Sequence, residues 1–379
     1  MTSKNTIYIE KLQLLNFKNY EEATLLFSPE INILTGQNGS GKTNLLDAIH
    51  FISVSKSAFN LSDSQCIMHG HPYFLVSCNI SGGAGNHLVQ CSFQQGQKKV
   101  LKIDKKPYEK ITEHIGKFPV VLITPYDTDL IREGSEERRK FFDSILSQLD
   151  SNYLNDLIHY NHFLKQRNSS LKKFRESGKT DFDLLESYDS QIIPFGQKIH
   201  KSRKDFIKEF LPFFHKNYDE ISDKAEQVNL VYESQLTSQN FGDLLKKSRE
   251  KDIVLERTTT GVHRDDYNFL LKDLPIKNLG SQGQQKSFVI GLKLGQYDII
   301  QKKKELCPLL LLDDIFDKLD EKRIEKLLQM IGNKKFGQLF ITEARLGRSR
   351  QLLEGLSSDL RIFKVENGRV QLIDDKQGQ

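Results

Sequence analysis

A glycine-rich loop near residue 40 places the strongest constraint on how this chain can fold. Residues 36–43 read Gly-Gln-Asn-Gly-Ser-Gly-Lys-Thr, which fits the pattern G-x-x-x-x-G-K-[ST]. The apolar run 31–35 before the loop predicts a short strand, and residues 44–52 after it have the apolar spacing of a helix. In that setting, backbone N–H groups and the helix amino terminus form a nest for phosphate groups. The sequence therefore predicts a P-loop in an α/β fold.

The loop residues divide into those expected to shape the site and those expected to act in it. All eight are candidate nucleotide contacts: Gly36, Gln37, Asn38, Gly39, Ser40, Gly41, Lys42 and Thr43. We expect Lys42 to supply a positive charge to the β- and γ-phosphates of ATP, and Thr43 to offer its hydroxyl to Mg²⁺. The structural alternative is a glycine-rich turn that matches by accident, which the flanking strand and helix disfavour.

Two aspartates follow a run of leucines near residue 310. Residues 309–312 are all leucine, and Asp313 and Asp314 come directly after them. A continuous apolar run is typical of a central parallel strand, and ligands bind at the carboxyl ends of such strands. We expect Asp313 to hold Mg²⁺, and Asp314 to orient or deprotonate the attacking water. The alternative is that both aspartates only cap a turn.

A short polar segment, Ser-Gln-Gly-Gln-Gln at 281–285, precedes a helical stretch. It resembles the signature of ABC-type ATPases, in which such a tip contacts the γ-phosphate held by a second subunit. That resemblance makes Ser281 and Gln284 candidate nucleotide contacts and implies an ATP-dependent homodimer. Asp320 resembles the D-loop of the same proteins. The structural alternatives are a glycine turn with a helix cap at Ser281, and a cap for a helix over 321–331 at Asp320.

The apolar periodicity changes along the chain and suggests an inserted arm. Residues 1–135 carry the P-loop and a predicted β-meander over 73–107, and residues 257–379 carry the leucine run and further strands. Between them, residues 136–256 have helical spacing, with a turn at 177–180 and a predicted kink at Pro194. Helices of roughly 25 to 30 residues would extend about 40 Å. We therefore expect an ATPase head in two parts, 1–135 and 257–379, with a mainly helical arm at 136–256.

Composition and charge limit the class of protein. The chain has 379 residues, of which 37% are hydrophobic and 28% charged, as in ordinary soluble proteins. No apolar run approaches the roughly 20 residues that span a bilayer. The four cysteines are scattered without metal-ligand spacing, which favours reduced thiols and a cytoplasmic location away from membranes. The net charge of +5 permits an anionic partner.

Two clusters of basic residues in the predicted arm are candidate DNA contacts. The segment 157–175 contains no acidic residue, and a second cluster follows near residue 200. The members are Lys165, Arg167, Lys172, Lys173 and Arg175, and then Lys198, Lys201, Arg203 and Lys204. Such clusters bind phosphates without reading sequence, although a solvated helix face is the commoner explanation. No aromatic ladder or recognition helix is visible, so base readout is not expected.

Six blocks together resemble the RecF family, bacterial recombination and gap-repair ATPases related to SMC proteins. Besides the P-loop block 36–49 and the segment 281–285, they are Leu-Asn-Phe-Lys-Asn-Tyr at 15–20, Ser-Glu-Glu-Arg-Arg-Lys-Phe-Phe-Asp at 135–143, Gly-Val-His-Arg-Asp-Asp at 261–266, and residues 311–320. Val262 replaces the usual proline. Thr342 stands where many ABC ATPases carry a histidine, and a Q-loop is best placed in 124–129.

The resemblance implies an α/β fold of the ABC/SMC-type head, a mixed sheet with a P-loop helix. It implies ATP and Mg²⁺ as cofactors, weak hydrolysis that acts as a switch, and a dimeric clamp on duplex DNA, gap edges included. It further implies other recombination mediators as partners, and a part in replication restart, recombination, gap repair and the SOS response to DNA damage. The alternative is a P-loop kinase or another ABC-type ATPase that does not act on DNA.

Two further groups of residues allow two interpretations each. His263 and Arg264 either act near the nucleotide or belong to a buried ion-pair cluster with Asp265 and Asp266. Arg138 and Arg139 either form a salt bridge on a helix face or couple the nucleotide to the arm.

Overall fold

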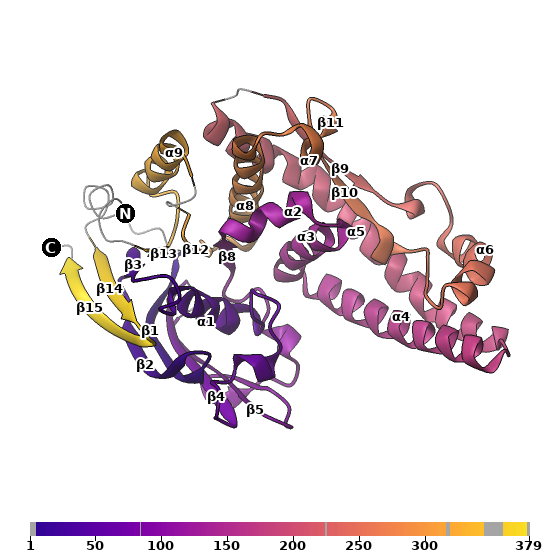
Figure 1. Cartoon of the computed structure of the whole chain (residues 1–379), viewed down its shortest axis with the longest axis horizontal. Helices are drawn as coiled ribbons and strands as arrows, with labels where there is room; N and C mark the ends of the chain where they lie inside the picture. Colours follow the sequence, from indigo (N-terminus) through magenta and orange to yellow (C-terminus); the bar gives the residue numbers. More distant parts are fainter. Residues whose placement is uncertain (1–4, 84, 224–225, 316–318, 345–358, 377–379) are drawn as a thin grey trace. The chain divides into compact units, whose positions relative to one another are not determined.

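The structure, a computed structural model, describes residues 5–83, 85–223, 226–315, 319–344 and 359–376 (Figure 1). It divides into two compact units. The first unit comprises Met1–Asp127, Lys216–Lys224 and Lys286–Gln379, and the second comprises Thr128–His215 and Ala225–Gln285. The assignment of 1–135 and 257–379 to an ATPase head and of 136–256 to an arm stays a prediction.

A six-stranded sheet in the order β15-β14-β3-β13-β12-β8 forms the centre of the first unit. Its strands are β3 (Ile31–Thr35), β8 (Val120–Ile123), β12 (Leu309–Leu312), β13 (Leu339–Glu343), β14 (Leu360–Glu366) and β15 (Arg369–Lys376). All pair in parallel except β14 with β15. The four leucines of β12 are fully buried, as expected of a strand covered on both faces. The predicted mixed sheet is therefore confirmed.

A second sheet of the first unit is antiparallel, in the order β2-β1-β4-β5-β6-β7. Its strands are β1 (Ile7–Phe17), β2 (Tyr20–Leu26), β4 (Tyr73–Gly82), β5 (His87–Gln94), β6 (Val100–Ile103) and β7 (Lys106–Pro107). Strands β4 to β7 follow one another in space, which confirms the predicted meander. Helix α1 (Lys42–Val54) contacts strands of both sheets and so lies between them. Phe17, Phe51 and Phe74 pack edge to face in the shared core.

The second unit is mainly helical, with a three-stranded antiparallel sheet. The helices are α2 (Asp129–Arg132), α3 (Ser135–Leu149), α4 (Ser151–Ser177), α5 (Phe182–Ser222), α6 (Phe241–Val254) and α7 (Ile276–Leu279), and the strands are β9 (Val228–Glu233), β10 (Asp266–Leu271) and β11 (Leu274–Pro275). Helix α5 has 41 residues and continues past Pro194 and Pro212, so it is longer than predicted. Its last residues belong to the first unit.

The first unit also contains most of α8 (Gln282–Lys304) and all of α9 (Glu321–Gly332). Among the described residues no helix is long and apolar enough to span a bilayer. The four cysteines are free, and Cys66, Cys78 and Cys91 are buried in the first unit. Burial raises the pKa of the Cys66 thiol to about 11, so this thiol stays protonated at neutral pH.

Candidate functional site

The glycines of the P-loop are required by close contacts with neighbouring segments. A Cβ atom at Gly36 would lie 2.2 Å from the Val365 carbonyl oxygen, and one at Gly41 would lie 2.4 Å from Asn19 Nδ2. Gly41 also has a φ of 117°, which L side chains rarely adopt. Gly39, with a φ of 82°, faces open space, because nothing lies within 4 Å of its Cβ position. The loop is therefore held on two sides and open on the third.

Side chains of the β1–β2 turn hold the loop backbone from outside. Tyr20 donates its hydroxyl proton to the Gly41 carbonyl at 2.9 Å, and Asn19 Nδ2 donates to the Ser40 carbonyl at 3.2 Å. Asn44 Nδ2 of α1 donates in turn to Asn19 Oδ1 at 2.8 Å. Sequence reasoning noted the block 15–20 only as part of the resemblance and assigned it no role. Its adjacent Asn and Tyr were the available signal.

Lys42 begins α1 and folds back over the loop. Its Nζ donates to the carbonyls of Gly36 at 2.8 Å and Gln37 at 3.2 Å, and its side chain is almost fully buried. Ser40 Oγ is buried without a hydrogen-bond partner among the described residues. A buried ammonium whose hydrogen bonds, among the residues that the structure describes, go to two carbonyls favours an anion in the loop, and so does the orphaned Ser40 hydroxyl. The chemistry of the P-loop therefore fits a bound phosphate chain.

Thr43 and Asp313, each expected from sequence to hold Mg²⁺, meet across 270 residues of sequence. The Thr43 hydroxyl donates to the Asp313 carboxylate at 2.9 Å (Oδ1) and 3.1 Å (Oδ2). Burial raises the pKa of Asp313, while hydrogen bonds from Thr342 and Thr43 counteract part of that shift. A cation beside this buried carboxylate would offset its desolvation. The pair therefore fits Mg²⁺.

Thr342 holds both aspartates and was not predicted to do so. Its Oγ1 donates to Asp313 Oδ1 at 2.8 Å and accepts the backbone N–H of Asp314, also at 2.8 Å. From the sequence, Thr342 was noted only as the residue that stands where many ABC ATPases carry a histidine. Its place at the end of β13, which pairs with β12, was the signal that could have identified it.

A cavity of about 510 Å³ lies over these residues, entirely within the first unit. It is lined by Asn38, Gly39, Gly41, Lys42, Thr43, Asn44, Pro125, Tyr126, Asp313 and Asp314. The volume falls in the range of small-molecule and cofactor sites. No group of three or more His, Cys, Asp or Glu among the described residues could hold a metal by itself. Mg²⁺ here would therefore depend on phosphate and water oxygens as well, as Mg²⁺ sites commonly do.

The segment where a Q-loop was expected forms one wall of the cavity through Pro125 and Tyr126. Asp127 fixes this segment, since its carboxylate accepts the Thr124 backbone N–H at 2.6 Å and pairs with Lys293 Nζ at 2.7 Å. Lys293 of α8 also donates to the Leu122 carbonyl at 2.9 Å. The backbone that carries the exposed Tyr126 ring is therefore anchored to α8 through Lys293.

The predicted signature residues lie at the start of α8. The Ser281 backbone N–H donates to Gln284 Oε1 at 2.6 Å, and the Gln284 backbone N–H donates to Ser281 Oγ at 3.2 Å. This is a capping box, as the structural alternative suggested. Both residues belong to the second unit, whereas the P-loop and Asp313 belong to the first. A role for Ser281 and Gln284 in contacting nucleotide stays a prediction.

Asp320 caps the amino terminus of α9, as the structural alternative predicted. Its carboxylate accepts the Arg323 backbone N–H at 3.1 Å at the start of α9, and it pairs with the Arg323 side chain. Arg323 Nε also donates to Ser287 Oγ at 2.6 Å. Residues 316–318, which completed the D-loop resemblance, lie outside the described residues. A nucleotide contact by Asp320 stays a prediction.

The Gly261–Asp266 segment forms a buried cluster in the second unit. His263 Nε2 donates to the Thr258 carbonyl at 3.0 Å, so Nδ1 accepts the Tyr160 hydroxyl at 2.7 Å. Burial lowers the pKa of His263 to about 4, consistent with this neutral form. Arg138 binds Asp266 with two hydrogen bonds of 2.7 and 2.9 Å, and Arg139 donates to the Asp265 carbonyl at 2.6 Å. The ion pair of the structural alternative is present for Arg138. His263 is buried as a neutral ring bonded to Tyr160 and Thr258, Arg139 reaches a backbone carbonyl, and Arg264 is exposed.

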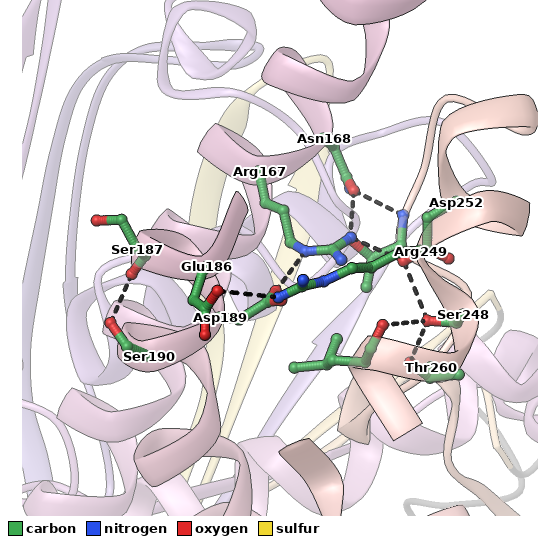
Figure 2. Close-up of polar contacts among 12 residues, drawn as sticks. Arg167, Asn168, Glu186, Ser187, Asp189, Ser190, Ser248, Arg249, Asp252 and Thr260 are labelled. Atoms are coloured by element: carbon green, nitrogen blue, oxygen red, sulfur yellow. Dashed lines mark hydrogen bonds and ion pairs between the residues drawn. The ribbon is translucent and has the colours of Figure 1, made fainter. Parts of the chain in front are cut away.

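The prediction that both basic clusters contact DNA is wrong for Arg167 and Arg203, because these two side chains are buried. Figure 2 shows Arg167 between the carboxylates of Asp189 and Asp252, each 2.8 Å away. Arg203 pairs with Asp143 at 2.9 Å and Asp265 at 2.8 Å. Neither arginine is available to DNA. The remaining members of the clusters are exposed: Lys165, Lys172, Lys173, Arg175, Lys198, Lys201 and Lys204.

Replacing Thr342 with valine is expected to lower ATP turnover roughly 10- to 100-fold, the usual effect of losing a residue that orients metal ligands. Valine keeps the shape but removes the hydroxyl that holds Asp313 and Asp314. Phosphate release and binding of a labelled nucleotide would be measured together. Thr24→Val on the exposed face of β2 is the control. Unchanged turnover in Thr342→Val would show that the hydroxyl does not orient the aspartates.

Comparison with known proteins places this site in a family. The family model "RecF/RecN/SMC N terminal domain" matches residues 8–371. The DNA replication and repair protein RecF of Cytophaga hutchinsonii is 46% identical over 96% of this chain and 97% of its own length. The protein of the same name from Flavobacterium johnsoniae is 44% identical over 95% of this chain and 100% of its own.

Solved structures agree with the sequence comparison. A structure titled recombination mediator protein RecF-ATPrS in the RecFOR pathway matches with a TM-score of 0.88 and 29% identity over 99% of this chain and 100% of that one. The Smc head domain of Pyrococcus furiosus, with a TM-score of 0.56 and 17% identity over 97% of this chain and 96% of that one, shares the fold. The predicted ABC/SMC-type head is thereby confirmed. The chain therefore belongs to the RecF family, within the RecF/RecN/SMC group of ATPases.

Proposed function

We propose that the chain is an ATP-gated clamp on duplex DNA that serves DNA replication and repair. Two copies would close over two ATP molecules, and each P-loop would face the Ser281 tip of the other copy. The meeting of Thr43 and Asp313 over an open cavity is the observation that carries the ATP half of this proposal. The DNA half is supported by family membership and by relatives named DNA replication and repair proteins.

The residues at the cavity have distinct tasks in this proposal. Lys42 would leave the loop carbonyls and pair with the β- and γ-phosphates, while loop N–H groups hold the remaining phosphate oxygens. Thr43 and Asp313 would hold Mg²⁺, which neutralises charge as the γ-phosphate leaves. Asp314 would orient or deprotonate the attacking water, and Thr342 would keep both aspartates in place.

Slow hydrolysis follows if each site needs the other copy. Binding of ATP would then favour the closed dimer, and hydrolysis would release it, so the nucleotide acts chiefly as a switch. In this scheme residues 1–135 and 257–379 work as the head, and 136–256 works as the arm. The exposed lysines of α4 and α5 would contact DNA phosphates, and other recombination mediators would be partners in the cytoplasm, at gap edges in particular.

Substitution of Ser281 by arginine is expected to abolish ATP-dependent dimerisation. A long cationic side chain at the start of α8 would block the approach of a second P-loop and disrupt the capping box with Gln284. Light scattering with ATP, with ADP and without nucleotide would measure mass. The wild-type chain should double in mass only with ATP, and Ser281→Arg should stay monomeric.

Two further samples make the test decisive. Asn240→Arg, at the exposed N-cap of α6 in the second unit, should dimerise as the wild type does. Duplex DNA added at low and high salt should bind the ATP form, with an affinity that falls steeply as salt rises. A monomeric wild type in ATP would refute the dimer, and failure of duplex DNA to bind at low salt would refute the clamp.

A further inference from the structure

Three aromatic rings from α4 and α5 form a column in the second unit. His159 of α4 stacks on Phe195 of α5 with ring centroids 5.1 Å apart and planes inclined by 11°. Phe163, one turn further along α4, lies on Phe195 at 6.2 Å and 12°. The sequence hid this column because Phe195 is 32 positions away from Phe163, so no aromatic ladder was visible along the chain.

The His159 ring ends the column and is held in place although it is exposed. Its Nδ1 donates to the Asn155 carbonyl one turn earlier, at 2.7 Å. This bond fixes the tautomer and the ring orientation, and Phe195 packs against one ring face. An exposed side chain normally pays an entropic cost when it is ordered by a ligand. The His159 ring is already ordered in the free protein by Asn155 and Phe195, so a ligand that stacks on it loses little binding free energy to ordering this side chain.

The surroundings of the column favour a ligand with a flat ring and a negative backbone. Lys198 Nζ lies 5.8 Å from the Phe195 centroid, and its side chain is 63% exposed. Lys201 follows on the same face of α5, three residues on. Asp156, the acid paired with Lys198 at 3.6 Å, is largely covered, with 18% exposure.

We infer that this ring column, His159–Phe195–Phe163, is a stacking site for an unpaired base of a DNA strand. Every base has a π-face, so stacking accepts any sequence, and neighbouring lysines would hold the phosphates. Paired bases cannot enter, because their faces are covered by the duplex stack. This inference rests on the proposed DNA binding and adds a means to distinguish a gap edge from intact duplex.

The test uses the full-length protein with ATP and Mg²⁺ and a duplex that carries 2-aminopurine. The fluorescent base is placed at the first unpaired position of a gap or, in a second duplex, at a paired position. Wild-type protein should quench the unpaired base and leave the paired base unchanged. His159→Ala should lose the quenching and about tenfold in affinity for gapped DNA, with intact duplex binding unaltered.

Two variants separate stacking from folding. His159→Phe keeps a flat ring and should restore quenching, whereas Asn161→Ala, exposed on another face of α4, should behave as the wild type. If no DNA binds, the proposed function itself fails. If gapped DNA binds but the unpaired base is not quenched, or if His159→Ala weakens gapped and intact DNA equally, the stacking site is refuted while the clamp stands.

Discussion

Replacing Asp252 with alanine is expected to lower the free energy of unfolding by about 3 to 5 kcal/mol, the usual cost of breaking a buried ion pair by removing one partner, since Asp189 alone would then face the buried Arg167. Arg167 is fully buried, and its Nη1 donates to Asp252 Oδ2 at 2.8 Å. The other oxygen of Asp252 accepts the Thr259 backbone N–H at 2.9 Å and the Thr259 hydroxyl at 2.6 Å. Urea unfolding followed by circular dichroism would measure the loss.

Two control variants separate the loss of the buried ion pair from other effects of the substitution. Glu250→Ala, exposed on the same helix, should change stability by less than about 0.5 kcal/mol. The double variant Arg167→Met with Asp252→Ala should be more stable than Asp252→Ala alone, because Asp189 keeps its pair with Arg249 at 3.1 Å and no surplus positive charge is left buried. A loss below about 1 kcal/mol in Asp252→Ala would show that the Asp189 carboxylate suffices for Arg167.

Substitution of Asp314 by asparagine is expected to lower ATP turnover by about 10² to 10⁴-fold while ATP binding persists, since the change removes the proposed general base and leaves Thr43 and Asp313 in place. Asparagine is the right replacement because Asp314 has a φ of 46°, in the left-handed region that asparagine tolerates. Alanine there would add backbone strain. Single-turnover hydrolysis and equilibrium nucleotide binding would be measured on the same preparation.

The neighbouring aspartate provides the contrast. Asp313→Asn should weaken Mg²⁺-dependent nucleotide binding as well as turnover, because Asp313 accepts from Thr43 and Thr342 and is the expected metal ligand. Asp104→Asn, on an exposed turn between β6 and β7, should change neither. Normal turnover in Asp314→Asn would assign the base to another group.

The parts of the molecule that local patterns encode were predictable from sequence. The P-loop needs a strand, glycines and a helix in direct succession, and residues 31–54 supply all three. The leucine run ending in Asp313 identified a central strand, because only such a strand is apolar on both faces. Each pattern assigned one residue to Mg²⁺, Thr43 and Asp313 respectively, and the structure brings these two side chains into contact.

Features that depend on partners from distant elements were not predictable. Arg167 looked like part of a basic surface because no acid lies within 157–175, yet its partners Asp189 and Asp252 come from α5 and α6. Arg203 is buried for the same reason. A helix pattern shows which face is apolar, but not which charges other helices will place against an arginine.

The order of strands in the central sheet has a consequence for synthesis of the chain. Strand β3 lies between β13 and β14, and Ile31 is in register with both Leu339 and Leu360. The strand that leads into the P-loop therefore has no neighbour in the sheet until about 300 further residues have left the ribosome. Contacts within Thr128–His215 can form earlier. A nascent chain thus carries an apolar strand without its sheet partners for most of its translation, and such a strand is prone to aggregate until β13 and β14 emerge.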